Sequence, residues 1–122
     1  MAAVVVDTSV FAALIFGEPK SDEAKRLLNG HRLYAPTLMG YELAQVTVKK
    51  IEKYPKEQEK IFAALSFALN LDINWLEINF NSVVKLALEC ELTAYDASYL
   101  YLSRSLNIPL VTFDKVLKAH CT

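Results

Sequence analysis

The most informative segment of the sequence is AVVVDTS, residues 3–9. Its first four residues are small or β-branched and apolar, a composition typical of a strand buried on both faces of a sheet. Asp7, Thr8 and Ser9 follow at once, and all three residue types are common at the start of a helix. The stretch therefore predicts a strand over Ala3–Val6 that leads directly into a helix.

The same succession of strands and helices continues along the chain. Apolar runs predict further strands at Arg32–Ala35, Trp75–Ile78 and Leu110–Phe113, and segments with helical periodicity separate them. Strands that alternate with helices pair in parallel through right-handed crossovers. We therefore expect an α/β fold, a three-layer α/β/α sandwich around a short, mostly parallel twisted sheet, which residues 1–122 form as a single domain.

Composition limits the class of protein. Hydrophobic residues make up 53% of the chain and charged residues 22%, which indicates a folded domain rather than a disordered one. The high apolar content also leads us to expect a homodimer that covers part of it. A formal net charge of -1 provides no overall positive field to attract nucleic acid or an anionic membrane, so any RNA binding must depend on local charge.

The cysteines and the apolar segments indicate the compartment. Cys90 and Cys121 lack the paired spacing of a zinc site or a disulfide framework, which favours a reducing, cytoplasmic location. Residues 1–17 are mostly apolar, but they lack a basic leading region and contain Asp7, so we expect no signal peptide. The apolar run Ile61–Leu71 is too short to span a bilayer, and we expect no membrane partner.

Four acidic residues are predicted to meet at one edge of the sheet. Asp7 and Asp114 follow predicted strands, and ligands of open parallel sheets bind beyond the carboxyl ends of the strands. Glu42 and Asp96 lie early in helices that begin at this same edge. All four carboxylates can therefore converge.

A purely structural role is also open for three of these acids. Asp7 and Asp114 are suitable N-caps, and Asp96 follows Thr93 by three residues, as in a capping box. Glu42 lies too deep in its helix to be an ordinary cap. A half-buried carboxylate at that position needs a partner.

Carboxylates gathered in one crevice repel one another unless a cation neutralises them. Oxygen ligands without nearby His or Cys favour Mg²⁺ or Mn²⁺ over zinc. Such an ion can activate water and stabilise charge on a phosphate. The pattern therefore indicates a metal-dependent phosphodiesterase.

Four segments carry a family resemblance: Val4–Val10, Tyr41–Ala44, Leu92–Leu100 and Pro109–Asp114. They resemble, in order and spacing, the acidic motifs of PIN domains, and most closely those of VapC toxins from type II toxin-antitoxin pairs. The resemblance implies an endoribonuclease dependent on Mg²⁺ or Mn²⁺, with Asp7, Glu42, Asp96 and Asp114 as its catalytic and metal-binding residues. It also implies a homodimer and a small VapB-like antitoxin partner that blocks the acidic site.

The same resemblance concerns residues that would contact the substrate RNA. Thr112 matches a hydroxyl position often found beside the metal, and Thr8 and Ser9 are candidates for similar work. Cations could contact RNA phosphates, although a solvated surface is the simpler explanation for each of them: Lys49, Lys50, Lys53, Arg104, Lys115 and Lys118. Helical periodicity also predicts many inward positions, among them Tyr41, Val84, Tyr95 and Tyr99.

Two other functions remain open. A catalytically inactive PIN fold could serve as a binding or assembly module, although the complete set of four acids speaks against it. A receiver-like signalling domain also uses an acidic Mg²⁺ pocket, but it needs a phosphoacceptor Asp after the central strand and a later Lys. The order of acids in this chain supplies neither clearly. Fold class alone does not decide between an enzyme and a binding module.

Overall fold

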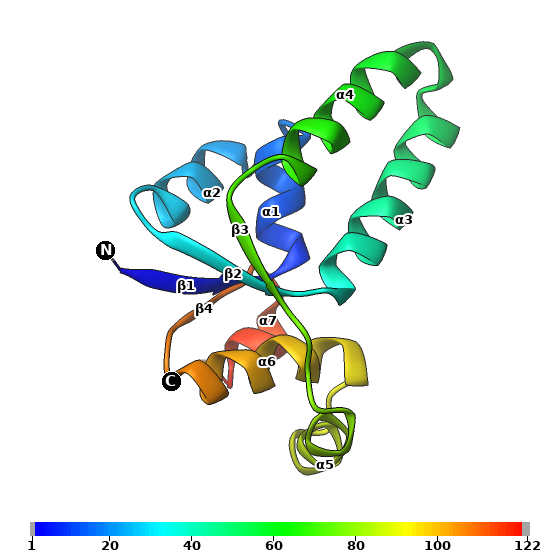
Figure 1. Cartoon of the computed structure of the whole chain (residues 1–122). Coiled ribbons are helices and arrows are strands. Elements are labelled where there is room, and N and C mark those ends of the chain that lie inside the picture. The colour runs from blue at the N-terminus through cyan, green and yellow to red at the C-terminus, as the bar shows by residue number, and fades with distance from the viewer. Residues whose placement is uncertain (1, 121–122) are drawn as a thin grey trace.

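A computed structural model describes residues 2–120 (Figure 1). Four strands form one parallel sheet in the order β3-β2-β1-β4: β1 (Ala3–Val6), β2 (Arg32–Pro36), β3 (Ile73–Leu76) and β4 (Leu110–Val111). The two strands that precede Asp7 and Asp114, β1 and β4, are neighbours with Val6 paired to Val111. This order brings the chain segments that carry the two acids to the same edge of the sheet.

Helices cover both faces of this sheet. On one side lie α1 (Thr8–Ile15), α2 (Ser21–Leu28), α3 (Leu38–Lys53) and α4 (Gln58–Leu69), with a short 3₁₀ turn, η1 (Pro55–Glu57), between the last two. On the other side lie α5 (Phe80–Cys90), α6 (Ala94–Leu106) and α7 (Lys115–Lys118), and α5 packs on α6. The predicted three-layer α/β/α sandwich is confirmed.

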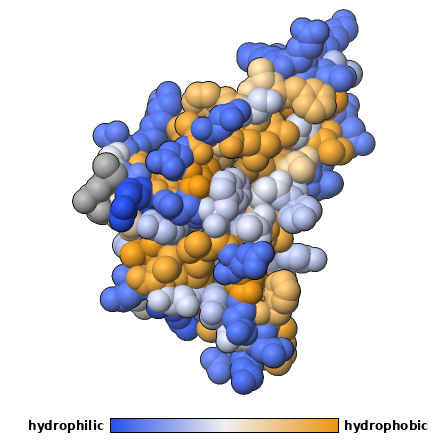
Figure 2. Space-filling model, in the orientation of Figure 1, coloured by the Kyte–Doolittle hydropathy of each residue, from blue (hydrophilic) through white to orange (hydrophobic). Residues whose placement is uncertain are grey.

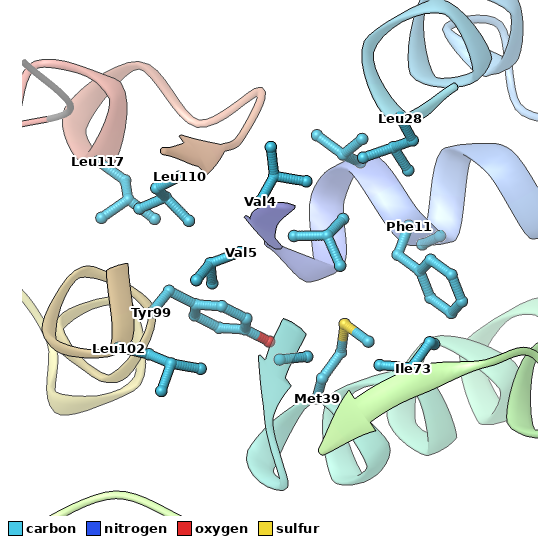
Figure 3. Close-up of a cluster of buried hydrophobic side chains, with 14 of the residues drawn as sticks. Val4, Val5, Phe11, Leu28, Met39, Ile73, Tyr99, Leu102, Leu110 and Leu117 are labelled. Atoms are coloured by element: carbon cyan, nitrogen blue, oxygen red, sulfur yellow. The ribbon is translucent and has the colours of Figure 1, made fainter. Parts of the chain in front are cut away.

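The core is built around β1. Val4, Val5 and Val6 are all buried, as expected for a central strand with helices on both faces. Phe11 of α1 packs in the core from one side and Tyr99 of α6 from the other (Figure 3). The run of valines therefore fixes β1 in the centre and starts α1 at the edge where the acids are expected.

Three predicted strands differ from those observed. The second was expected at Arg32–Ala35 and also includes Pro36. The third was expected at Trp75–Ile78 but spans Ile73–Leu76, because β3 is an edge strand and tolerates the exposed Asn74 that an apolar run would exclude. The fourth was expected to reach Phe113 but ends at Val111. Its backbone then leaves the sheet, and the Asp114 N–H donates to Thr112 Oγ1 at 3.0 Å.

Several predicted core positions are wrong, and others are confirmed. Tyr41, Val84 and Tyr95 are 78%, 51% and 62% exposed, whereas Tyr99 is 1% exposed. Tyr41 and Tyr95 lie in the first turns of their helices, which begin beyond the strand ends, so the sheet does not cover them. Val84 is on α5, which packs on α6 rather than on the sheet.

Apolar residues are therefore visible on the surface. Figure 2 shows them over α4 and over α5 and α6, while the tip of the α3–α4 hairpin is hydrophilic. No helix within residues 2–120 is both long and apolar enough to cross a bilayer. Cys90 is half-buried with a free thiol, and Cys121 lies outside the described residues.

Candidate active site

Asp7 is a buried carboxylate held by two hydroxyl groups. Its side chain is 6% exposed, and its Oδ2 accepts hydrogen bonds from Ser9 Oγ at 2.8 Å and Thr112 Oγ1 at 2.6 Å. Ser9 comes from the first turn of α1 and Thr112 from the segment after β4. The backbone N–H of Asp7 donates to the Val111 carbonyl at 3.0 Å, so the β1–β4 pairing itself positions this acid.

The structure separates the capping role from the other roles open to the acids. Asp7 occupies the N-cap position of α1 but makes no side-chain capping hydrogen bond, so the cap explanation fails for this residue. Asp114 does cap α7, because its Oδ1 accepts from the Leu117 N–H at 2.9 Å. In α6 the capping group is the Thr93 hydroxyl, which accepts from the Asp96 N–H at 3.0 Å. The predicted capping box at Thr93 is confirmed to this extent.

Glu42 is half-buried on α3 and is tied to two other elements. Its Oε1 accepts hydrogen bonds from Thr8 Oγ1 at 2.9 Å and from the Tyr99 hydroxyl, and the two hydroxyl oxygens lie 2.6 Å apart. Burial and the charge of Glu42 raise the pKa of Tyr99 above its usual value. The phenol therefore remains protonated and donates to the carboxylate.

Asp96 shows that the acids share an electrostatic environment. Its pKa is raised first by burial and then by the negative charges of Asp114, Asp7 and Glu42, while the Thr93 hydroxyl acts in the opposite direction. The three carboxylates of Asp7, Glu42 and Asp114 therefore lie within electrostatic range of Asp96.

No Lys or Arg neutralises this region within the described part of the chain. The ion pairs within residues 2–120 are Lys50–Glu18 at 2.7 Å and Arg26–Glu23 at 3.9 Å, and neither includes one of the four acids. Oxygen donors that repel one another and have no cationic partner suit a hard divalent ion. The donor set therefore fits Mg²⁺ or Mn²⁺.

The spacing of the acids limits how an ion could be held. Among residues 2–120, no three side chains of His, Cys, Asp or Glu lie close enough together to hold a metal ion directly. Mg²⁺ commonly keeps several waters and binds only one or two carboxylates. This arrangement resembles an open acidic bowl more than a closed cage.

The three predicted hydroxyl residues all lie at the site, and each is hydrogen-bonded to an acid. Thr8 donates to Glu42, whereas Ser9 and Thr112 donate to Asp7. Tyr99 was expected only in the core, and its contact with Glu42 was missed. Its position three residues after Asp96 on the same helix was the available signal, because such residues share a face.

Two hollows flank the acids. The first, of about 450 Å³, is lined by Ser9, Phe113, Lys20 and Lys50 among others, and the Lys20 ammonium lies 4.7 Å from the centre of the Phe113 ring. Lys50, one of the predicted RNA contacts, is the residue paired with Glu18. Lys20 was not predicted.

The second hollow, of about 290 Å³, is apolar. Its lining includes Tyr41, Phe80, Val84 and Tyr95, and none of its lining residues is charged. Tyr41 and Tyr95 are the chain neighbours of Glu42 and Asp96. We call this hollow the apolar groove.

The match to a family model decides the relationship of this chain to known proteins. Residues 4–121 match the model of the PIN domain. The chain belongs to the PIN domain family. Membership supports a nuclease, and it removes the receiver-like alternative. The predicted resemblance is confirmed at this level.

Solved structures agree with this assignment. PAE2754 from Pyrobaculum aerophilum is 27% identical, with a TM-score of 0.80 over 99% of this chain and 86% of that one. VapC20 from Mycobacterium tuberculosis, a toxin that cleaves the sarcin-ricin loop, is 18% identical, with a TM-score of 0.69 over 96% and 94%. VapBC2 from Rickettsia felis, bound to promoter DNA, is 16% identical, with a TM-score of 0.69 over 96% and 92%. The last two share the fold with this chain. A comparison with curated proteins finds no match.

Proposed function

We propose that this chain is an endoribonuclease that uses Mg²⁺ or Mn²⁺ to hydrolyse phosphodiester bonds of RNA, with residues 1–122 acting as a single nuclease domain. The observation that carries the proposal is the geometry of two of the acids in a chain that matches the PIN domain: Asp7 is buried between the hydroxyls of Ser9 and Thr112, and Glu42 is held by Thr8 and Tyr99. The raised pKa of Asp96, caused first by burial and then by the charges of Asp114, Asp7 and Glu42, agrees with it. A divalent cation among these groups would relieve their repulsion. All four acids would then serve as the catalytic and metal-binding set.

In the proposed site, the hydroxyl side chains around these acids orient the carboxylates. Ser9 and Thr112 hold one oxygen of Asp7, and Thr8 holds one oxygen of Glu42. Their hydroxyl protons are used in these hydrogen bonds, which favours a role in orienting the acids over direct contact with RNA. The bound ion would supply Lewis acidity, activating water and stabilising charge on the scissile phosphate.

RNA binding requires positive charge close to this acidic region. The hollow beside Ser9 contains Lys20, which is exposed, and Lys50, which is paired with Glu18. Lys20 is therefore the cation we assign to a phosphate of the bound RNA, because it lines this hollow, lies over the Phe113 ring and has no ion-pair partner among the described residues.

A toxin role and an antitoxin partner follow from the likeness to VapC20 and VapBC2. We assign the chain to a toxin-antitoxin pair, with a small VapB-like protein that covers the acidic site. A cytoplasmic location fits this role. Expression of the chain alone should arrest growth of a host cell, and co-expression of the small neighbouring gene product should relieve the arrest.

We also propose that two copies associate through the apolar groove. Phe80 is 76% exposed and Tyr41 and Tyr95 are similarly open, so each copy offers both a hollow and projecting rings. The lining carries no cation for an RNA backbone and no charge for a charged peptide, whereas depletion of charge is typical of homodimer interfaces. A second copy is therefore the occupant that this chemistry favours.

A binding module without nuclease activity is the second candidate. It is favoured by the spacing of the acids, since no three of the relevant side chains within residues 2–120 can hold an ion directly. It predicts a complex with a partner protein and no effect of metal on RNA.

Incubation of the purified chain with structured RNA tests the two candidates. The nuclease predicts internal cleavage with added Mn²⁺, none with EDTA, and strongly reduced cleavage by Asp7→Asn with added Mn²⁺. Cleavage that persists in EDTA and in the Asp7→Asn protein would come from a contaminant and would remove the basis of the proposal. Absence of cleavage in a folded, inhibitor-free sample would favour the binding module.

A further inference from the structure

Tyr99 is a core residue with its polar end at the acidic site. Its side chain is 1% exposed, and Figure 3 shows the ring among Val5 and Leu102 with the hydroxyl oxygen pointing away from α6. That hydroxyl meets Glu42 Oε1 and Thr8 Oγ1. Hydrogen bonds among these three oxygen atoms therefore connect α1, α3 and α6, which are far apart in the sequence.

The hydroxyl protons of Thr8 and Tyr99 determine the direction of the hydrogen bonds to Glu42. Thr8 and Tyr99 have one hydroxyl proton each, and both oxygens lie within hydrogen-bonding distance of Glu42 Oε1. The carboxylate has no proton to give, so it accepts from both. Among the described residues, the hydrogen bonds to Glu42 all go to Oε1 and leave Oε2 for another ligand.

Fixing this carboxylate in advance matters because Glu is a flexible side chain. A free Glu loses rotamer freedom when it binds an ion, and that cost lowers the affinity. The Glu42 side chain has already lost this rotamer freedom when the protein folds, because its Oε1 is held by hydrogen bonds. The buried ring of Tyr99, packed against the core, is a rigid support for the donor.

We infer that Tyr99, assisted by Thr8, is a positioning residue that holds Glu42 Oε1 and leaves Oε2 free to bind a divalent ion. The inference rests on the proposed metal-dependent function. Tyr99 itself does not contact the ion or the RNA. It acts through Glu42, as partners of metal ligands generally do.

The Tyr99→Phe variant separates this role from simple packing. Phe keeps the buried ring and removes only the hydroxyl group. Tyr101→Phe is the matched control, since Tyr101 is half-buried on the same helix and packs against the core without a hydrogen bond to the four acids among the described residues. Thr8→Val removes the second donor, and Thr8→Ser restores it.

The experiment is a calorimetric titration of Mn²⁺ into the metal-free proteins, with thermal unfolding recorded for each. We expect Tyr99→Phe to bind Mn²⁺ about tenfold to a hundredfold more weakly than the wild type. Thr8→Val should be weaker than Thr8→Ser, and Tyr101→Phe should match the wild type. The Mn²⁺ concentration for half-maximal RNA cleavage should rise by the same factor as the dissociation constant.

The outcomes distinguish the two proposals. Wild-type protein that binds no Mn²⁺ would overturn the proposed function and this inference with it. Wild-type protein that binds Mn²⁺, with Tyr99→Phe equal to it, would overturn the positioning role alone. If Tyr99→Phe does not fold, the Thr8→Val and Thr8→Ser pair decides, and equal affinities of these two would overturn the inference.

Discussion

The acidic edge of the sheet buries polar side chains, whereas the apolar groove beside it exposes aromatic ones. Each is the reverse of the usual arrangement in a folded domain. At the edge, Asp7, Thr8 and Thr112 are buried. In the groove, Tyr41, Phe80 and Tyr95 are mostly exposed. The two regions adjoin, because Tyr41 precedes Glu42 in the chain and Tyr95 precedes Asp96.

The two regions differ in the interactions that their side chains make. Within residues 2–120, no buried side-chain N or O atom lacks a hydrogen-bond partner, so the hydroxyls satisfy the buried oxygens of the edge. Hydroxyls provide protons but no charge, and the repulsion felt by Asp96 remains. Within residues 2–120 no ion pair with Lys or Arg includes one of the four acids, and the aromatic side chains of the groove are exposed. An ion suits the acidic edge and a protein surface suits the groove.

The largest expected effect comes from breaking the acidic edge. Asp7→Asn keeps the shape of the side chain and removes its charge, and we expect RNA cleavage at saturating Mn²⁺ to fall by about 10³-fold, because a metal ion supplies several kcal/mol to such a transition state. Asp22→Asn, an exposed acid on α2, is the control and should keep full activity. Cleavage rates with a fluorescent RNA measure both. Equal activity of the two variants would contradict the assignment of Asp7.

A charge placed in the apolar groove should break the proposed dimer without affecting the acidic edge. Phe80→Asp should raise the dimer dissociation constant by about 30-fold or more, as loss of a central aromatic side chain commonly costs 2 kcal/mol or more. Phe67→Asp is the matched control, since Phe67 is 63% exposed on α4, away from the groove. Sedimentation velocity over a range of concentrations measures the change. Dissociation caused by Phe67→Asp and not by Phe80→Asp would move the interface to α4.

A smaller effect is expected at the cation beside the edge. Lys20→Gln should weaken RNA binding a few-fold for all sequences and reduce the slope of log affinity against log salt by about 0.7, the value for one phosphate contact on a single strand. Binding is measured by fluorescence anisotropy in Ca²⁺, so that RNA is not cleaved. Lys56→Gln, at the hairpin tip, should leave the slope unchanged. An unchanged slope for Lys20→Gln would exclude a phosphate contact.

The smallest expected effect is on the stability of the metal-free protein. The pKa of Asp96 is raised on folding, by burial first and then by Asp114, Asp7 and Glu42. Above the ordinary carboxyl pKa of about 3.9, the folded state therefore holds more protons than the unfolded state. The contribution of Asp96 to the free energy of unfolding then falls as pH rises through this window and remains unfavourable at neutral pH.

Replacement of Asp96 tests this sign. Metal-free Asp96→Asn should unfold at a higher temperature than the wild type at pH 7, and its melting temperature should depend less on pH above 4. Calorimetric unfolding between pH 4 and pH 7 measures both. A lower melting temperature for Asp96→Asn at pH 7 would show that Asp96 stabilises the fold through other contacts.

The contrast between the two regions also explains what the sequence could predict. The valines of β1 are surrounded by protein on both faces, so their composition alone determined the strand and the start of α1. The acids followed, because strand ends in a parallel sheet fall at one edge. Periodicity was a poorer guide for Tyr41 and Tyr95, since it gives the direction of a side chain and not whether anything lies there to cover it.

Contacts between distant segments were beyond prediction. The hydrogen bonds of Ser9 and Thr112 with Asp7 depend on the register of β1 and β4, which no local pattern specifies. Tyr99 matched the spacing of a core residue and is one, but its hydroxyl also reaches Glu42. The ring of one residue can pack in the core while its hydroxyl contacts the site. Apolar spacing in the sequence predicts only the burial of the ring.

Anomalous diffraction from crystals of the chain grown with Mn²⁺ would locate the ion. We expect a Mn²⁺ peak in the region bounded by Asp7, Glu42, Asp96 and Asp114, within coordination distance of at least one of their oxygens, and no such peak in crystals of Asp7→Asn. Bound Mn²⁺ elsewhere on the molecule, with that region empty, would contradict this expectation and leave the four acids without the ion that their repulsion calls for.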